Sequence, residues 1–257
     1  MRQAAICGAV LMLMAGPASA CRLALLLAID VSRSIDAGDY RIQRNGLLDA
    51  FADPAIRAAL FGPPDPVALA IFEWSGTSHH EVIVDWSVIR STADLARVEA
   101  AIAARTLPAI RRATALGAAL DYGRQTMARA PPCAETVIDV SGDGQNNMGP
   151  PPALVYAGAD WGGIRVNGLA IGEHEATLLD YYRTQVIRGR GAFVQDAPRQ
   201  TDFPEAFRRK LLRELTEMMV GQAGAVGQAG ADAAIPVMAR SDGHAGSPTA
   251  QGFPRGP

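Results

Sequence analysis

Three oxygen-bearing side chains follow an apolar run near the start of the sequence. Asp30, Ser32 and Ser34 occupy alternate positions directly after the aliphatic stretch Leu23–Ile29. A short apolar run without alternation is typical of a strand that is buried on both faces of a parallel sheet. In a tight loop leaving such a strand, this spacing lets three oxygens turn toward one point, which suits a hard cation such as Mg²⁺. Taken alone, the same residues are explained better as caps of the next helix.

Two later segments carry residues of the same chemical kind. Thr114 stands just before a helix predicted over Leu116–Ala128, and Asp143 lies in a loop after a strand predicted over Glu135–Val140. Ligands of doubly wound α/β folds sit beyond the carboxyl ends of the strands, where the strand order reverses. Because Asp30 and Asp143 both follow strands in this way, we expect them to lie at the same edge of the sheet.

The elements that must position these residues alternate between strands and helices. Six segments have the apolar content and length of strands: Leu23–Ile29, Val67–Trp74, Glu81–Val88, Glu135–Val140, Ile164–Ile171 and Gly191–Gln195. Six have helical spacing: Asp39–Leu60, which Pro54 interrupts, Ser91–Ala104, Leu116–Ala128, Pro150–Ala159, Glu175–Ile187 and Phe203–Val220. This order predicts an α/β fold, doubly wound, with a mostly parallel six-stranded sheet and helices on both faces. The short link between the second and third strands fits a hairpin, which makes the third strand an antiparallel edge.

Length and composition favour a single exported domain. The chain has 257 residues, of which 49% are hydrophobic and 19% charged, and its net charge of −2 gives no indication of nucleic acid binding. Residues 1–20 combine an early arginine, a short apolar core and a small-residue cleavage site, which predicts a signal peptide. Residues 21–220 form the predicted domain, and residues 221–257 are predicted to be a disordered tail. The apolar run in 1–20 is too short for a membrane span, so we expect a periplasmic or extracellular protein.

Two cysteines remain once the signal peptide is removed. Cys21 lies nine residues before Asp30, and Cys133 lies ten residues before Asp143. If the two strands are parallel neighbours, both cysteines begin their strands at the same end of the sheet. This geometry predicts a disulfide between Cys21 and Cys133 in an oxidising compartment. The alternative is that Cys21, which follows small residues at the cleavage site, carries a lipid anchor.

The residues singled out above together resemble the metal-ion-dependent adhesion site (MIDAS) of von Willebrand factor type A domains. Asp30, Ser32 and Ser34 match the DxSxS motif of that family. Thr114 matches its single threonine before a helix, and Asp143 matches its aspartate in a strand-end loop. All three parts occur in the family's order within an α/β pattern, which makes the resemblance more specific than DxSxS alone.

The resemblance implies a binding function. It covers about residues 22–220, and the loop Ser141–Asn147, which reads SGDGQNN, resembles an exported bacterial branch of these proteins. In the family, the serine and threonine hydroxyls bind Mg²⁺ directly, the two aspartates often act through water, and one coordination position stays open. An acidic group of a protein partner fills that position, and Mn²⁺ and Ca²⁺ are the alternatives to Mg²⁺. We therefore expect an exported, metal-dependent, adhesion-type module whose oligomeric state the sequence does not determine.

Two other functions are compatible with the same residues. One is a metal-assisted hydrolase on the same fold, although the motifs tie no His, Lys or Glu to the site as a general base. The other is a structural domain whose metal site is vestigial.

Three residues near the site are candidates for contact with a partner. Glu173 and His174 follow the fifth predicted strand, and Asn146 lies shortly after Asp143. Their ordinary interpretations are a charged start of the next helix for Glu173 and His174, and shaping of the loop for Asn146.

Overall fold

The computed structural model describes residues 21–109 and 112–228, with side chains described up to Glu217. The chain divides after Val220 into two units, and the candidate site lies in the first. The predicted signal peptide over residues 1–20 and most of the predicted tail, residues 229–257, lie outside the described residues. Among the helices of the described ranges, none is long and apolar enough to cross a membrane.

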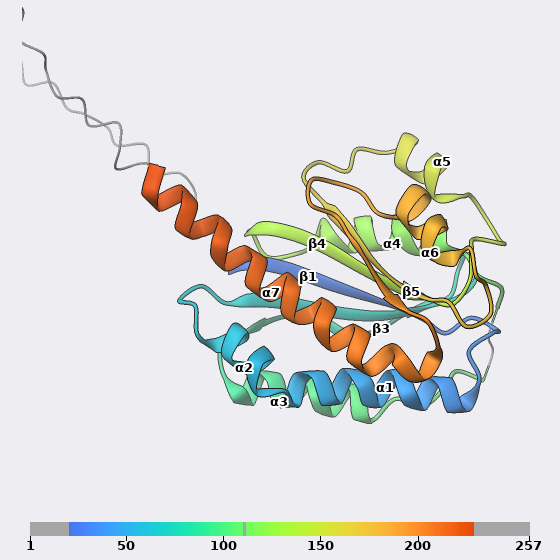
Figure 1. The fold of residues 1–257 in the computed structure, drawn as a ribbon, viewed down its shortest axis with the longest axis horizontal. Helices are drawn as coiled ribbons and strands as arrows, with labels where there is room; N and C mark the ends of the chain where they lie inside the picture. Colours follow the sequence, from blue (N-terminus) through green and yellow to red (C-terminus); the bar gives the residue numbers. More distant parts are fainter. Residues whose placement is uncertain (1–20, 110–111, 229–257) are drawn as a thin grey trace, which may run out of the picture. The chain divides into compact units, whose positions relative to one another are not determined.

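A six-stranded sheet with the order β3-β2-β1-β4-β5-β6 forms the centre of the domain (Figure 1). The strands are β1 (Cys21–Asp30), β2 (Val67–Trp74), β3 (His80–Ile89), β4 (Cys133–Gly142), β5 (Arg165–Ile171) and β6 (Val194–Ala197). All neighbouring strands are parallel except β2 and β3, which form an antiparallel hairpin at one edge. Because β1 lies between β2 and β4, the sheet grows outward from β1 in both directions, and the predicted doubly wound fold is confirmed.

Helices cover both faces of this sheet (Figure 1). One face packs against α1 (Ala37–Ala52), α2 (Pro54–Phe61), α3 (Thr92–Ala103) and α7 (Phe203–Gln228). The other packs against α4 (Leu116–Met127), α5 (Pro152–Ala157) and α6 (Leu178–Tyr181). Successive residues of β1 enter the two cores in turn, and all ten are buried. The continuous apolar run at the start of the domain therefore marks the central strand, as expected for a strand covered on both faces.

Cys21 and Cys133 form the predicted disulfide. They are register partners at the start of the parallel strands β1 and β4, and their Cα atoms are 4.5 Å apart. The sulfur of Cys21 is used in this bond, which is incompatible with a lipid on the same atom.

Two boundaries late in the chain differ from the prediction for local reasons. The helix predicted from Glu175 begins only at Leu178, because the Glu175 carboxylate accepts a hydrogen bond from the backbone of another loop instead of starting a helix. The strand predicted from Gly191 begins at Val194, because Gly191 has a φ of 74° and forms a turn. The helix predicted to end at Ile187 continues beyond α6 as a π turn over Tyr182–Val186, and the other predicted boundaries agree within two residues, apart from the end of the last helix.

The last helix is longer than predicted. α7 continues to Gln228, eight residues beyond the predicted end of the helix at Val220. The segment 221–228 lacks apolar periodicity and contains three glycines, which are poor helix formers, so local propensity does not account for the extension.

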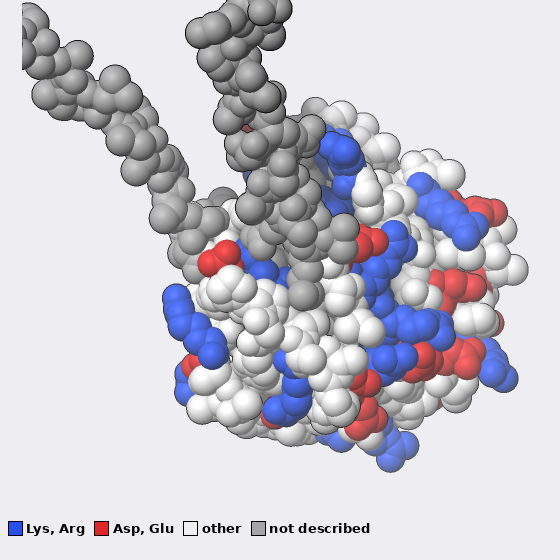
Figure 2. Space-filling view, turned by 60° about the vertical axis from the view of Figure 1, so that its left-hand side comes forward, with Lys and Arg blue, Asp and Glu red and all other residues white. Residues whose placement is uncertain are grey.

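Basic and acidic side chains are interspersed on the surface of the domain. Figure 2 shows them next to one another across the face in view. Several are neighbours on one helix turn, such as Arg208 with Glu205 and Arg213 with Glu217 on α7. This face therefore presents a mixed charge pattern without a large field of one sign.

Candidate metal site

The candidate site lies at the carboxyl ends of the two central strands. Asp30 is the last residue of β1, and Asp143 directly follows β4. The strands are parallel neighbours, with Ile29 opposite Ser141. The chain leaves β1 toward α1 on one face of the sheet and enters β4 from α4 on the other. This is the switch point at which open α/β sheets bind ligands, so both aspartates stand where the sequence placed them.

A chain of hydroxyl groups joins the predicted residues. The Ser34 hydroxyl donates a hydrogen bond to Asp143 Oδ1 at 2.6 Å, and Ser32 Oγ lies 3.2 Å from Ser34 Oγ. Thr114 Oγ1 donates to Ser32 Oγ at 3.3 Å. The backbone N–H of Ser32 donates to Asp30 Oδ1 at 2.7 Å. The structure thus brings all five residues together from segments more than 100 residues apart.

The five residues differ in exposure, and the exposed one marks the side on which the site is open to solvent. Asp30, Ser32, Thr114 and Asp143 are buried, with exposed fractions of 0, 0, 4 and 3%. Ser34 is exposed. A ligand arriving from solvent therefore meets the site on the Ser34 side.

The two carboxyl groups are held where their negative charge is poorly stabilised. Burial, and then the charge of Asp143, raise the pKa of Asp30 well above its ordinary value. Burial also raises the pKa of Asp143, although the hydrogen bond from Ser34 and the charge of His174 oppose the rise. A cation between the two groups would offset this desolvation and repulsion.

The loop after β4 holds Thr114 in place. The Asn147 side chain accepts a hydrogen bond from the backbone N–H of Thr114 at 2.9 Å, and the Asn147 backbone donates to the Thr114 carbonyl at 2.9 Å. The Asn146 side chain accepts from the N–H of Gly117 at 3.0 Å, in the first turn of α4. These bonds fix the start of α4 beside the site. They support a role of Asn146 in shaping the loop rather than in contacting a partner.

The other two candidates for partner contact lie in the loop after β5. The Glu173 carboxylate accepts a hydrogen bond from the backbone N–H of Gln200 at 2.7 Å, so it ties two loops together. His174 is exposed and near enough to Asp143 for its charge to act on that carboxyl. Of the two residues, His174 has the side chain that is free to face a partner at the rim.

The donor set fits a small divalent cation. Ligands about 2.1 Å from Mg²⁺ at right angles to one another are about 3.0 Å apart. The oxygen–oxygen distances of 2.6, 3.2 and 3.3 Å along the hydroxyl chain are close to this edge length. Asp30 Oδ2 is buried and has no hydrogen-bond partner among the described residues, although buried polar atoms normally have one. In the described part of the chain no cluster of three or more His, Cys, Asp or Glu suits a metal, so a cation at this place would need the hydroxyls as ligands.

One residue beside the site was not singled out by the sequence analysis. The hydroxyl of Tyr182 is buried near Asp30 and, like Asp30 Oδ2, has no hydrogen-bond partner among the described residues. Tyr182 begins a π turn, Tyr182–Val186, that follows α6. No motif marks it, and the only available signal was its place in a helix predicted next to the site.

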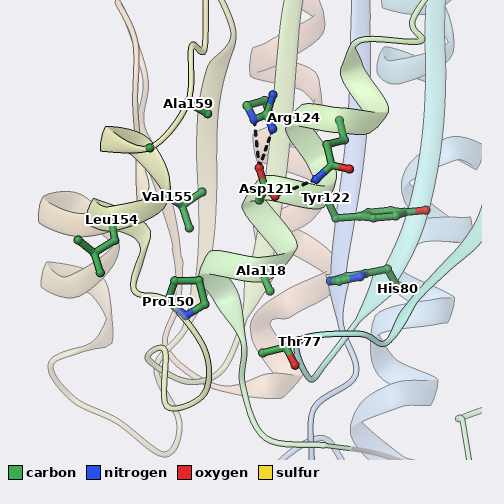
Figure 3. A pocket seen from close by; sticks show the side chains of 12 residues that line it. Thr77, His80, Ala118, Asp121, Tyr122, Arg124, Pro150, Leu154, Val155 and Ala159 are labelled. Atoms are coloured by element: carbon green, nitrogen blue, oxygen red, sulfur yellow. Dashed lines mark hydrogen bonds and ion pairs between the residues drawn. The ribbon is translucent and has the colours of Figure 1, made fainter.

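A separate groove lies on the α4 side of the domain (Figure 3). It has a volume of about 640 Å³ between the start of β3, α4 and α5. His80 stacks on Tyr122 there, with ring centroids 4.5 Å apart, and Leu154 and Val155 line the opposite wall. None of the five predicted metal ligands lines this groove.

The comparisons with known proteins support the fold and name a family. The family DUF1194, described as a protein of unknown function, matches residues 20–219. A comparison with curated proteins finds no match.

Several solved structures share the fold. Proximal thread matrix protein 1 from the mussel byssus, with a zinc-occupied MIDAS motif, has a TM-score of 0.54 at 19% identity, over 76% of this chain and 46% of that chain. The pilus adhesin SpaC from Lactobacillus rhamnosus GG has a TM-score of 0.54 at 12% identity, over 77% and 30%. BatB from Bacteroides thetaiotaomicron has a TM-score of 0.52 at 15% identity, over 76% and 99%.

These structural neighbours are von Willebrand factor type A-like, which agrees with the resemblance found in the sequence. The chain spans less than half the length of the mussel protein and of the adhesin. At these identities the likeness concerns the fold alone, and function has to be argued from the site.

Proposed function

This chain belongs to the DUF1194 family of proteins of unknown function, and on that premise we propose that it is an exported binding module. It engages a protein partner through a divalent cation held by Asp30, Ser32, Ser34, Thr114 and Asp143. Mg²⁺ is the proposed cation, with Mn²⁺ and Ca²⁺ as alternatives. The resemblance of the loop Ser141–Asn147 to an exported bacterial branch of type A-like proteins is part of this proposal.

The observation that carries the proposal is the convergence of three hydroxyls and two buried carboxyls at the switch point. Three of the five donors are neutral, so a bound cation would keep much of its positive charge and would attract an acidic group of the partner. Ser34 is exposed, which leaves a path for that group from solvent. The mussel protein with a zinc-occupied MIDAS supports a cation in this fold, and the pilus adhesin supports a binding role.

We propose binding rather than hydrolysis because the nearby carboxylates are already engaged. Glu173 and Glu175 accept hydrogen bonds from backbone N–H groups of Gln200 and Gln145, which suits loop anchoring more than general-base chemistry. Export is supported by the Cys21–Cys133 disulfide, because such bonds persist in oxidising compartments.

Thermal unfolding of the mature chain in EDTA, Mg²⁺, Mn²⁺ and Ca²⁺ tests the site. Ligand at 100 times its Kd stabilises the native state by about 2.7 kcal/mol, which raises Tm by roughly 5–10 °C for a domain of this size. We expect Asp30→Ala and Ser32→Ala to abolish the rise, and Asp85→Ala, which removes an exposed acid on β3, to retain it. A wild-type chain without any shift at millimolar metal contradicts the proposal.

The partner chemistry is tested with peptides. An aspartate-containing peptide should bind the metal-loaded chain, and its asparagine counterpart should not. Binding of the two peptides with equal affinity, or binding that survives EDTA, contradicts an acidic ligand at the cation.

A further inference from the structure

We propose that the Tyr182 hydroxyl is a positioning group for the metal site, which donates a hydrogen bond to the free oxygen of Asp30, directly or through one water. This inference rests on the proposed function and deepens it. It adds a residue from the π turn after α6 to a site otherwise built from the ends of β1 and β4 and the start of α4.

Two orphaned polar atoms carry the inference. Asp30 Oδ2 and the Tyr182 hydroxyl are both buried without a hydrogen-bond partner among the described residues. Asp30 and Tyr182 are both 0% exposed. An unpaired buried polar group costs free energy, so two such groups side by side indicate an arrangement that is completed by a further ligand or by a small movement.

Gly142 shows that the two atoms lie near the same point. A Cβ atom built on Gly142 would stand 2.7 Å from the Tyr182 hydroxyl and 2.9 Å from Asp30 Oδ2. Both atoms therefore lie within 3 Å of one point, at the last residue of β4. Glycine keeps this point clear, and the two groups are close enough for one water to join them.

The chemistry of the pair assigns the direction of the bond. A phenol, with an ordinary pKa of about 10, keeps its proton at neutral pH, while a carboxylate that binds a cation has only acceptor oxygens, so Tyr182 donates and Asp30 accepts. Asp30 Oδ1 is already fixed by the N–H of Ser32 at 2.7 Å. A second donor on Oδ2 fixes the rotation of the carboxylate, as outer partners of metal-binding groups generally do.

The position of Tyr182 on a π turn gives independent support. The backbone N–H of Ile187 bonds to the Tyr182 carbonyl, which is the wide turn over Tyr182–Val186. Such turns are rare in proteins and occur frequently at functional sites. The ring of Tyr182 also packs on the sheet, because a Cβ on Gly168 would stand 2.6 Å from it. A phenylalanine retains that packing and removes only the hydroxyl.

The test compares Tyr182→Phe with the wild type and with Tyr156→Phe. Tyr156 is the matched control, because its hydroxyl donates to the Val186 carbonyl, away from the metal ligands. Calorimetric titration of the mature chain with Mn²⁺ and Mg²⁺ gives Kd, and melts in EDTA report stability. We expect Y182F to raise the metal Kd by about 10- to 100-fold, with a Tm in EDTA within about 4 °C of wild type. Y156F should leave Kd unchanged.

The outcomes separate this inference from the proposed function. Equal metal affinities of the wild type and Y182F overturn the role of Tyr182 and leave the metal site intact. A wild-type chain that binds neither metal overturns the proposed function and this inference with it. A crystal structure with Mn²⁺ supplies a second readout: a Tyr182 hydroxyl bonded to Asp30 or its water supports the role, and a hydroxyl bonded elsewhere contradicts it.

Discussion

The space around each glycine at the end of β4 determines which substitutions the candidate site tolerates. Gly142 ends β4 with the Tyr182 hydroxyl and Asp30 Oδ2 nearer to its missing side chain than any normal contact. Gly144, two residues later, is different, because a Cβ there would stand 3.5 Å from the Thr114 hydroxyl, an ordinary contact distance. Substitution by alanine is therefore expected to be disruptive at Gly142 and tolerated at Gly144.

Gly142→Ala should destabilise the domain and weaken metal binding. The new methyl group displaces Asp30 or Tyr182, and overpacking of this kind costs about 1–3 kcal/mol. Gly144→Ala should change neither property by much. Melts in EDTA and Mn²⁺ titrations of both variants measure the two effects, and a Gly142→Ala variant with wild-type affinity would show that the close approach does not matter.

At the residue scale, the sequence pointed to the five candidate metal ligands but not to Tyr182, the residue proposed to position one of them. Asp30, Ser32 and Ser34 carry their chemistry in a local spacing, and two further motifs point to Thr114 and Asp143. Tyr182 has no such spacing, because it reaches the site from the π turn that follows α6. Contacts of that kind depend on how the loop packs, which no local pattern encodes.

At the scale of elements, a buried ion cluster attaches α7 to the sheet. Lys210 Nζ on α7 lies 2.6 Å from Asp139 Oδ1 on β4 and 2.7 Å from Glu214 Oε1 on the next turn of α7. Asn167 on β5 donates to the same Glu214 oxygen at 2.7 Å, and the Phe193 ring lies 5.2 Å from the ammonium. The cluster contains two carboxyl groups and one ammonium, so it is most stable with one proton retained on a carboxyl group.

Lys210→Met should destabilise the domain strongly at neutral pH. Removal of the ammonium leaves two buried carboxyl groups without a counter-ion, and breaking a buried pair in this way costs about 3–5 kcal/mol. Arg209→Met on the same helix is the matched control, since Arg209 is about half exposed and makes only a 3.5 Å pair with Glu205. Urea unfolding at pH 7 measures both variants, and similar losses for the two would contradict a special role of the buried cluster.

The same cluster should make stability fall as the pH rises. Burial, and then the charge of Glu214, raise the pKa of Asp139 from 3.8 to about 7 in the folded state. Between these pH values the native state retains a proton on Asp139 that the unfolded chain has lost. The contribution of this proton to the free energy of unfolding is therefore fully present below about pH 4 and is lost as the pH rises to about 7. A shift of this size corresponds to a loss on the order of 4 kcal/mol.

Asp139→Asn isolates this contribution from that of Asp30 and Asp143, whose pKa values are also raised. Urea unfolding of both proteins from pH 4 to pH 8 should show a steeper decline for the wild type than for Asp139→Asn. Parallel curves for the two proteins would mean that Asp139 does not titrate in this range.

Helices and strands were predictable where apolar residues follow a regular pattern in the sequence. The run Leu23–Ile29 indicated the central strand, and the link after Trp74 indicated the hairpin. The start of α6 and the start of β6 were not predictable, because Glu175 accepts a hydrogen bond from the distant Gln145 backbone and Gly191 forms a turn with a positive φ. Alternation of elements therefore identifies the fold class, while loop ends depend on tertiary contacts.

At the scale of the whole domain, the two central strands carry a covalent bond at one end and the candidate metal site at the other. Cys21 and Cys133 join the starts of β1 and β4, and Asp30 and Asp143 stand at their far ends. Ten residues of β1, at about 3.3 Å each, separate the two features by about 30 Å. Arg22 adds a buried connection at the disulfide end, where its guanidinium donates to carbonyls of α2 and α7.

Removal of the disulfide should therefore lower stability without changing metal affinity. The bond joins residues 112 positions apart, and constraint of so long a loop in the unfolded chain is worth about 4–5 kcal/mol in the chain-entropy model. The Cys21→Ser/Cys133→Ser double variant should show this loss in urea unfolding, and thiol mass mapping of the wild type should find both sulfurs oxidised. Because the sheet is close-packed between the two ends, the folded double variant should keep the wild-type Kd for Mn²⁺. A weakened Kd would mean that the start of β1 and β4 controls the geometry at their ends, and the site would then depend on the oxidation state of the domain.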